Sequence, residues 1–268
     1  MGESGDIRIW DNGKVLTWAE INRKRLPYIK LGEKLFKGMY NELKIQLLTE
    51  INEARDEQEM IQISRDIELE RRKVQEAFER YYAKTSVDWA KMTAKSGKSR
   101  LETKQEDDWL LMVLEYVRTK KGKGIDSIIA THGGDIENIV RKAVEQGISE
   151  GIGMDKIARN ISTAQGEMDT WKALRIARTE VVNATGEGVK IGASELPGNK
   201  TKTWISTFDQ RSRHDHMAMD GVEVPMNEMF NLPSGSRMEY PGDSVNGMAK
   251  DVCNCRCGYE ITVKKDSY

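Results

Sequence analysis

Residues 36–54 read FKGMYNELKIQLLTEINEA, and their spacing decides the fold expected for the first third of the chain. Apolar residues recur in this stretch at every third or fourth position: Phe36, Met39, Leu43, Leu47, Ile51 and Ala54. That spacing gathers them into one stripe along an α-helix. No glycine occurs between Gly38 and Gly97, and no proline occurs between Pro27 and Pro197. Because both residue types weaken or end helices, long uninterrupted helices can form here.

A second, looser stripe follows at Ile63, Ile67, Val74, Phe78 and Tyr81. We therefore expect a helical arm over residues 1–90, built from two long helices or one broken helix. An isolated amphipathic helix is only marginally stable. The stripes of the arm thus need each other or another protein, which makes the arm a candidate docking device for a large assembly.

Glycines divide residues 125–190 into three predicted helices. The first is amphipathic over residues 136–144 and is expected to end at Gly147, in the left-handed conformation that glycine favours. A short helix is expected to begin after Gly153, with Asp155 near the positive end of its dipole. A longer helix should follow over residues 171–184.

Residues 91–124 form a basic linker region between the arm and these helices. Two interpretations stay open: a solvated linker, which is the usual fate of a charge run, or a patch in which Lys120, Lys121 and Lys123 contact DNA. The chain as a whole carries 42 Lys+Arg against 43 Asp+Glu, a net charge of -1. Bulk attraction to nucleic acid is thereby excluded, and any DNA contact must be local.

The composition also bears on the compartment. No apolar run approaches the ~18 residues that cross a bilayer, and the first ten residues lack the basic-then-apolar pattern of a secretory signal. The three cysteines, Cys253, Cys255 and Cys257, are too close together for a disulfide between them to join distant parts of the fold. We therefore expect a soluble protein of a reducing compartment with no membrane span.

After Pro197 the sequence changes to short β-forming segments separated by turns. Residues 203–208 are rich in β-formers, and the apolar residues of the last segment are all odd-numbered: Cys253, Cys255, Cys257, Tyr259, Ile261 and Val263. One extended strand would place all of them on one face. The predicted fold class is α+β, a long helical N-terminal arm and helical middle followed by a small mixed or antiparallel-sheet C-terminal domain. Residues 125–268 then form one domain, with a helical half over 125–190 and a β-containing half over 197–268.

Opposite charges concentrate in residues 209–220, which include Asp209, Arg211, Arg213, His216 and Asp220. A helix that begins after Asp209 would bring Arg213, His216 and Asp220 to one side. The set is either a catalytic acid–base group or a polar clamp that fixes a loop against the sheet. None of the recurring catalytic or phosphate-binding motifs occurs in the sequence, so we favour the clamp and expect no enzymatic activity. Arg178 and Glu180 are expected to serve the same clamp.

The cysteines raise the question of a metal. His216, Cys255 and Cys257 are the candidate zinc ligands, but C-x-C-x-C is a weaker signal than two close C-x-x-C pairs. The alternative is that the cysteines act as small apolar residues of the core face. Apart from this open zinc alternative, no cofactor is expected.

Five motifs in a fixed order resemble those of a known family. They are Ile176-Ala177-Arg178-Thr179-Glu180, Lys202-Thr203-Trp204, Asp209-x-Arg211-x-Arg213-x-x-His216 with Asp220-Gly221, Pro241-Gly242-Asp243, and Asn254-Cys255-Arg256-Cys257. Together they look like the signature of the phage Mu F-like minor head proteins, also called the phage head morphogenesis domain, over about residues 115–262. The N-terminal helices carry no motif of this family.

The resemblance implies a minor head protein of a tailed bacteriophage, bound at the portal vertex inside the capsid and made in the host cytoplasm. It further implies a role in head assembly and in genome packaging or ejection. The partners implied are the portal protein, with scaffolding or major capsid protein and DNA as further candidates. Some relatives carry C-x-x-C where this sequence has Arg213-x-x-His216, and arginine cannot coordinate zinc.

A rival function comes from the likeness of this family to ADP-ribosyltransferases at the fold level. In that role Arg178 or Arg211 would hold the dinucleotide, and Ser206 and Thr207 would supply the strand-borne pair. A glutamate must also steer the ribose, and the candidates Glu228 and Glu239 are isolated. The sequence has no Glu-x-Glu pair downstream of Ser206 and Thr207. Because a fold analogy does not establish activity, a structural role is the preferred hypothesis.

Overall fold

The computed structural model describes residues 7–9, 17–96, 103–120 and 122–264. Its helices are α1 (Trp18–Glu53), α2 (Glu57–Asp66), α3 (Arg71–Ser96), α4 (Thr103–Lys120), α5 (Gly122–Glu150), α6 (Met154–Ser194), α7 (His214–Met217) and α8 (Ala249–Val252). Its strands are β1 (Ile7–Ile9), β2 (Lys200–Ile205), β3 (Glu223–Pro225), β4 (Phe230–Asn231), β5 (Arg237–Met238) and β6 (Gly258–Val263). The predicted α+β fold class is confirmed.

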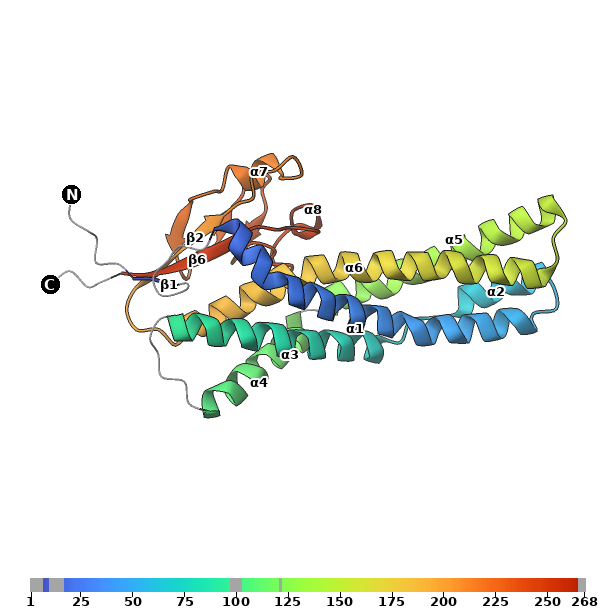
Figure 1. The fold of residues 1–268 in the computed structure, drawn as a ribbon, viewed down its shortest axis with the longest axis horizontal. Helices are drawn as coiled ribbons and strands as arrows, with labels where there is room; N and C mark the ends of the chain where they lie inside the picture. The colour runs from blue at the N-terminus through green and yellow to red at the C-terminus, as the bar shows by residue number, and fades with distance from the viewer. Residues whose placement is uncertain (1–6, 10–16, 97–102, 121, 265–268) are drawn as a thin grey trace.

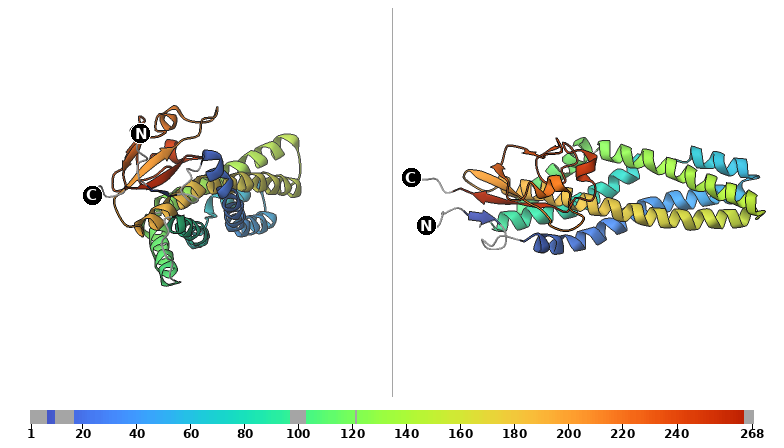
Figure 2. Two further views of the ribbon diagram at one scale, coloured as in Figure 1. Left: turned by 60° about the vertical axis from the view of Figure 1, so that its left-hand side comes forward. Right: turned by 90° about the horizontal axis from the view of Figure 1, so that it is seen from above.

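Helix α6 is the axis of the molecule. It is 41 residues long and contacts α1, α3 and α5 along its length. Figures 1 and 2 show these helices as an elongated bundle, with the β-sheet at one end and α2 beside α5 toward the other. Within the described part of the chain, no helix has both the length and the apolar content that crossing a bilayer requires.

The apolar stripe of residues 36–54, which was expected to dock on another protein, is instead buried inside the bundle. Phe36, Leu47 and Ile51 are fully buried in the main hydrophobic core, where α1 packs against α6. The expected docking arm is therefore wrong in this respect, because the partner that its apolar face requires is supplied by the chain itself. The division of the chain at residues 90 and 124 stays a prediction.

The middle of the chain differs from its prediction in the number of helices. The predicted short helix after Gly153 and the longer helix over residues 171–184 are one continuous helix, α6. Helix α5 also runs past Gly147 to Glu150, and Gly151 takes the left-handed conformation with a φ of 64°. Gly147 serves packing, since a Cβ there would lie 2.4 Å from the Ile157 side chain.

The sheet joins the two ends of the chain. Its four strands run in the order β1-β6-β2-β3, and each pairing is antiparallel, while β4 and β5 form a separate two-stranded ribbon. Strand β1, in a segment predicted to be helical, pairs with β6 in the register Ile7 to Val263. The sheet packs on α6, where the Tyr259 hydroxyl donates to the Gly186 carbonyl at 2.8 Å.

Two glycines let α3 approach the second half of α6 closely. A Cβ at Gly188 would lie 2.3 Å from the Ser86 carbonyl oxygen, and one at Gly192 would lie 2.4 Å from the Ala90 carbonyl oxygen. Backbone atoms cannot rotate away as a flexible side chain can. The two positions therefore fix the distance between these helices, and with it the platform beneath the sheet.

A cluster of polar side chains lies between α1, α5 and the first half of α6, away from the sheet. Lys172 pairs with Asp135 at 2.6 Å, and the buried ring of His132 stacks on Tyr40. One Asp169 oxygen has no hydrogen bond and lies 4.0 Å from His132 Nε2. Burial raises the pKa of Asp169 to about 6, and burial with the nearby Lys172 charge lowers the pKa of His132 to about 3.

We predict that Gly188→Ala destabilises the protein by about 1–3 kcal/mol, because the added methyl group overpacks the contact with α3. Gly133→Ala is the matched control, since a Cβ at that helical glycine meets nothing within 4 Å. The control should be stabilised by about 0.5–1 kcal/mol through better helix propensity. Urea unfolding measures both, and equal effects of the two variants would contradict the close approach.

The raised pKa of Asp169 predicts a pH-dependent stability. Asp169 retains a proton in the folded state that it loses in the unfolded state between about pH 4 and 6, so its contribution to the free energy of unfolding falls as pH rises through that window. The lowered pKa of His132 contributes in the opposite direction between about pH 3 and 6.5, so the comparison with a variant at position 169 isolates the carboxyl. Asp169→Asn removes this fall and should stabilise the protein at pH 7 by about 1–3 kcal/mol. Urea unfolding at pH 4.5 and 7.5 tests it, and an unchanged difference between the two pH values would refute it.

Candidate functional site

Asn183, in the second half of α6, lies where the helical bundle meets the C-terminal half. Its amide nitrogen donates to the Tyr82 hydroxyl at 2.7 Å and to Ser244 Oγ at 2.8 Å. Its amide oxygen lies 3.2 Å from the hydroxyls of both Tyr116 and Tyr240. Because an asparagine amide has two donors and one acceptor oxygen, this buried side chain is fully hydrogen-bonded, to α3, α4 and the segment after β5.

Two buried carboxylates extend this network. The Tyr82 hydroxyl donates to Glu180, and the Tyr240 hydroxyl lies 2.9 Å from Glu187. Tyr240 has a single proton, so it donates either to Glu187 or to Asn183. Burial raises the pKa of both tyrosines well above the usual range, so both stay protonated.

Arg178 and Glu180 lie on different sides of α6. Arg178 is exposed on α6, and Glu180 is buried against α3. Successive residues of a helix point about 100° apart. Two residues separated by one position therefore leave α6 in different directions.

The charged residues after β2 make separate local contacts. Arg256 binds both carboxylate oxygens of Asp209, and this pairing holds the pKa of Asp209 well below its usual range. Arg213 donates to the Cys253 carbonyl at 2.6 Å, and Asp220 accepts from the Ser206 backbone N–H at 2.7 Å. Arg211 is exposed, 4.0 Å from Asp209.

The predicted helix from Asp209 is much shorter than expected. Helix α7 begins at His214, because residues 209–212 form a turn in which Ser212 Oγ accepts from the Asp209 N–H at 3.1 Å. His216 is buried on the core side of this short helix, whereas Asp220 lies beyond its end and is exposed. Arg213, His216 and Asp220 thus each contact a different part of the structure.

The Asn254–Cys257 motif is held by the start of α1, a contact that the sequence did not reveal. The buried Arg25 donates to the carbonyls of Arg256 and Cys257 at 3.2 and 2.9 Å, and to Thr185 Oγ1 at 3.0 Å. Trp18 Nε1 adds a bond to the Arg256 carbonyl at 3.1 Å. Burial lowers the pKa of Arg25 to about 10, which leaves it charged at neutral pH. An arginine within an amphipathic helix gives no sequence signal of burial.

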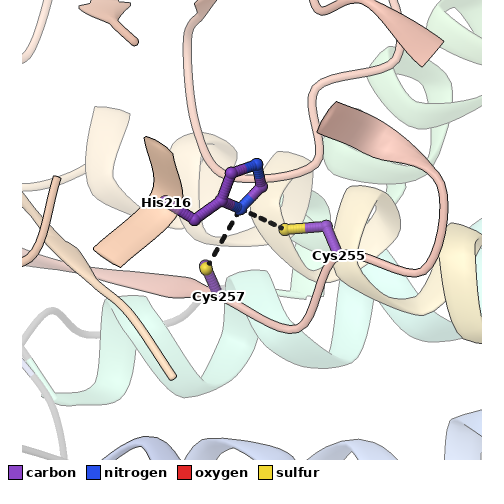
Figure 3. A group of neighbouring side chains, drawn as sticks. All are labelled: His216, Cys255 and Cys257. Atoms are coloured by element: carbon purple, nitrogen blue, oxygen red, sulfur yellow. Dashed lines mark hydrogen bonds between the residues drawn. The ribbon is translucent and has the colours of Figure 1, made fainter. Parts of the chain in front are cut away.

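His216, Cys255 and Cys257 meet in the interior (Figure 3). His216 Nδ1 lies 3.7 Å from Cys255 Sγ and 3.4 Å from Cys257 Sγ. Hydrogen bonds from Cys255 and then from His216 lower the pKa of Cys257, whereas the thiol of Cys255 has a raised pKa.

The predicted strand over residues 253–263 is wrong in its first half, since β6 begins only at Gly258. Asn254 is in the left-handed conformation with a φ of 53°, and its N–H donates to Thr179 Oγ1. This turn leaves Cys253 exposed and directs Cys255 and Cys257 inward. The two inner thiols therefore share an environment that the third does not.

Part of the basic linker region is neutralised by acidic side chains. Lys91 pairs with Glu106 at 2.7 Å, and Arg118 pairs with Glu79 at 2.8 Å. Lys121 and the side chains of Lys120 and Lys123 lie outside the described residues. The DNA contact assigned to these three lysines stays a prediction.

Comparison with known proteins finds similarity over the part of the chain that contains this site. Residues 138–260 match the family described as Phage Mu protein F like protein. The chain is 31% identical to the minor head protein GP7 of Bacillus phage SPP1 over 125 residues. This alignment covers 46% of this chain and 40% of that protein. It is also 32% identical to the NAD(+)–arginine ADP-ribosyltransferase EFV of Enterococcus faecalis over 139 residues. This alignment covers 51% of this chain and 28% of that protein. The matches thus span less than half the length of either relative, and no solved structure matches significantly.

We predict that Asn183→Ala lowers the free energy of unfolding by about 3 kcal/mol, because it removes the hydrogen bonds that this buried amide makes to three tyrosine hydroxyls and to Ser244. Asn22→Ala is the control, since Asn22 makes one local bond to the Trp18 carbonyl on α1. Its effect should stay within about 0.5 kcal/mol. Chemical unfolding followed by tryptophan fluorescence measures both variants, and an effect of Asn183→Ala as small as that of the control would disprove the role of this amide.

Proposed function

We propose, from the match of residues 138–260 to the Phage Mu protein F like family and the similarity to a minor head protein, that this chain is a structural component bound at the portal vertex of a tailed-phage head. It acts there in head assembly and in packaging or delivery of the genome. The protein resides inside the virion, after synthesis in the host cytoplasm. Its partners are the portal protein and, in the assembling head, scaffolding or major capsid protein.

One observation carries this proposal: the matched residues coincide with the part of the chain whose charged side chains fix its shape. The Asp209 carboxylate accepts hydrogen bonds from Arg256, and the Asp220 carboxylate accepts one from a backbone N–H. The Arg213 guanidinium donates to a backbone carbonyl. Groups bound in this way are not available to transfer protons to a substrate. They instead suit a protein that must present a fixed surface to an assembly.

The contact with the portal requires a surface other than the buried stripe of α1. Two exposed aromatic side chains mark the alternatives. Trp171, on the first half of α6, is 58% exposed, and Phe208, in the C-terminal half, is 68% exposed. Exposed aromatic residues are frequent anchors in protein interfaces.

The transferase relative motivates a second candidate function, which the geometry does not favour. Glu239 pairs with Lys190 at 2.6 Å and lines a cavity of about 160 Å³, whose lining includes neither Arg178, Arg211 nor Ser206. The match covers 28% of that transferase. We expect no NAD⁺ hydrolysis by the purified chain. Turnover that is abolished by Glu239→Gln would favour the transferase function over the structural role.

Co-purification with the portal protein encoded by the same phage genome tests the principal proposal. Full-length chain and portal should co-elute in size-exclusion chromatography, because the complex is larger than either protein alone. Trp171→Ala and Phe208→Ala, compared with each other, assign the contact to one end of the molecule. A wild-type chain that associates neither with portal nor with assembled heads would contradict the proposal.

A further inference from the structure

The strongest unassigned feature is the group formed by His216, Cys255 and Cys257. Their candidate ligand atoms all lie within 4.8 Å of one another, and all three side chains are buried, with at most 2% exposed. The histidine comes from α7 and the cysteines from the turn before β6, some 40 residues later. Figure 3 shows both sulfur atoms directed at the same ring nitrogen.

The spacing of these hydrogen-bonded atoms also fits a shared metal ion. In a tetrahedral zinc site with Zn–N of about 2.0 Å and Zn–S of about 2.3 Å, ligand atoms lie about 3.5–3.8 Å apart. The two nitrogen–sulfur distances here are 3.4 and 3.7 Å. Thiolate and imidazole together are the ligands that zinc prefers over harder cations such as magnesium.

The other nitrogen of His216 supplies an independent observation. His216 Nε2 is buried without a hydrogen bond, and an Asp251 carboxylate oxygen faces it at 3.7 Å. The second oxygen of this buried carboxylate accepts from Ser234 Oγ at 2.8 Å, which holds its orientation. A carboxylate behind the far nitrogen of a histidine is the usual support of a metal ligand, because it fixes the tautomer that leaves the near nitrogen free.

The charges around the group also favour a cation that carries two thiolates. Loss of one proton from each cysteine would leave two negative charges in the interior, and a divalent ion would neutralise both. The guanidinium groups of Arg25 and Arg256 lie near both cysteines, but they are already hydrogen-bonded to the Cys257 carbonyl and to Asp209. Ser206 Oγ lies 3.8 Å from Cys257 Sγ and is a further polar group beside the proposed ligands.

We propose that His216 Nδ1 and the sulfurs of Cys255 and Cys257 bind one Zn²⁺, with Asp251 as the positioning residue behind His216. Binding releases the two thiol protons and uses the lone pair of the neutral imidazole. The ion fastens α7 to the turn before β6. This site is independent of the portal role, and it holds or fails separately from it.

Titration of the full-length, reduced and metal-stripped chain with Co²⁺ and Zn²⁺ tests the site. One ion should bind per chain, and the Co²⁺ form should show sulfur-to-cobalt charge-transfer absorption with the visible bands of tetrahedral cobalt. Cys257→Ser should lose that charge-transfer intensity in part and bind Zn²⁺ at least tenfold more weakly. Asp251→Asn should weaken Zn²⁺ binding by about 10–100-fold without changing the cobalt bands in kind.

Two matched controls come from the same segments. Cys253→Ser and His214→Asn replace exposed residues beside the proposed ligands, and both should keep the wild-type affinity and spectrum. If ligand variants fail to fold, the stoichiometry and cobalt spectrum of the wild type decide the matter. A folded, reduced wild-type chain that binds no Co²⁺, or equal losses in Cys253→Ser and Cys257→Ser, would overturn the proposal.

Discussion

The structure depends on one amide group, the side chain of Asn183. A helix normally presents one face to one neighbour, but this residue binds hydroxyl groups from α3, from α4 and from the segment after β5. Each of those groups is buried and would be costly to leave unpaired. The amide therefore couples the position of the helical bundle to that of the C-terminal half.

The sequence was sufficient for the fold class and insufficient for the packing. Stripes at Phe36, Leu43 and Leu47 predict helices reliably, since periodicity depends only on local spacing. Local spacing does not show which surface covers the stripe. For this reason the packing of α1 against α6 could not be predicted, and docking on another protein stayed an alternative. Strand β1 was missed for a related reason: three residues are too few for a pattern, and their partner lies at the opposite end of the chain.

The candidate site was predictable in composition and less so in arrangement. The motifs contain Asp209, Arg256 and His216, but spacing along the chain could not show that Asp209 pairs with Arg256 from the last motif rather than with neighbouring arginines. The alternation of the cysteines suggested a single strand. A left-handed Asn254 breaks it, and a backbone conformation of this kind is seldom evident in a single sequence.

The pairing of β1 with β6 has a consequence for synthesis in the cell. The earliest described residues to leave the ribosome find their partner strand only among the last, and Trp18 and Arg25 likewise wait for the carbonyls of Arg256 and Cys257. Closing so long a stretch of chain is slow. The sheet therefore cannot form before β6 has been synthesised, and a product that stops short of β6 exposes an open sheet edge to aggregation.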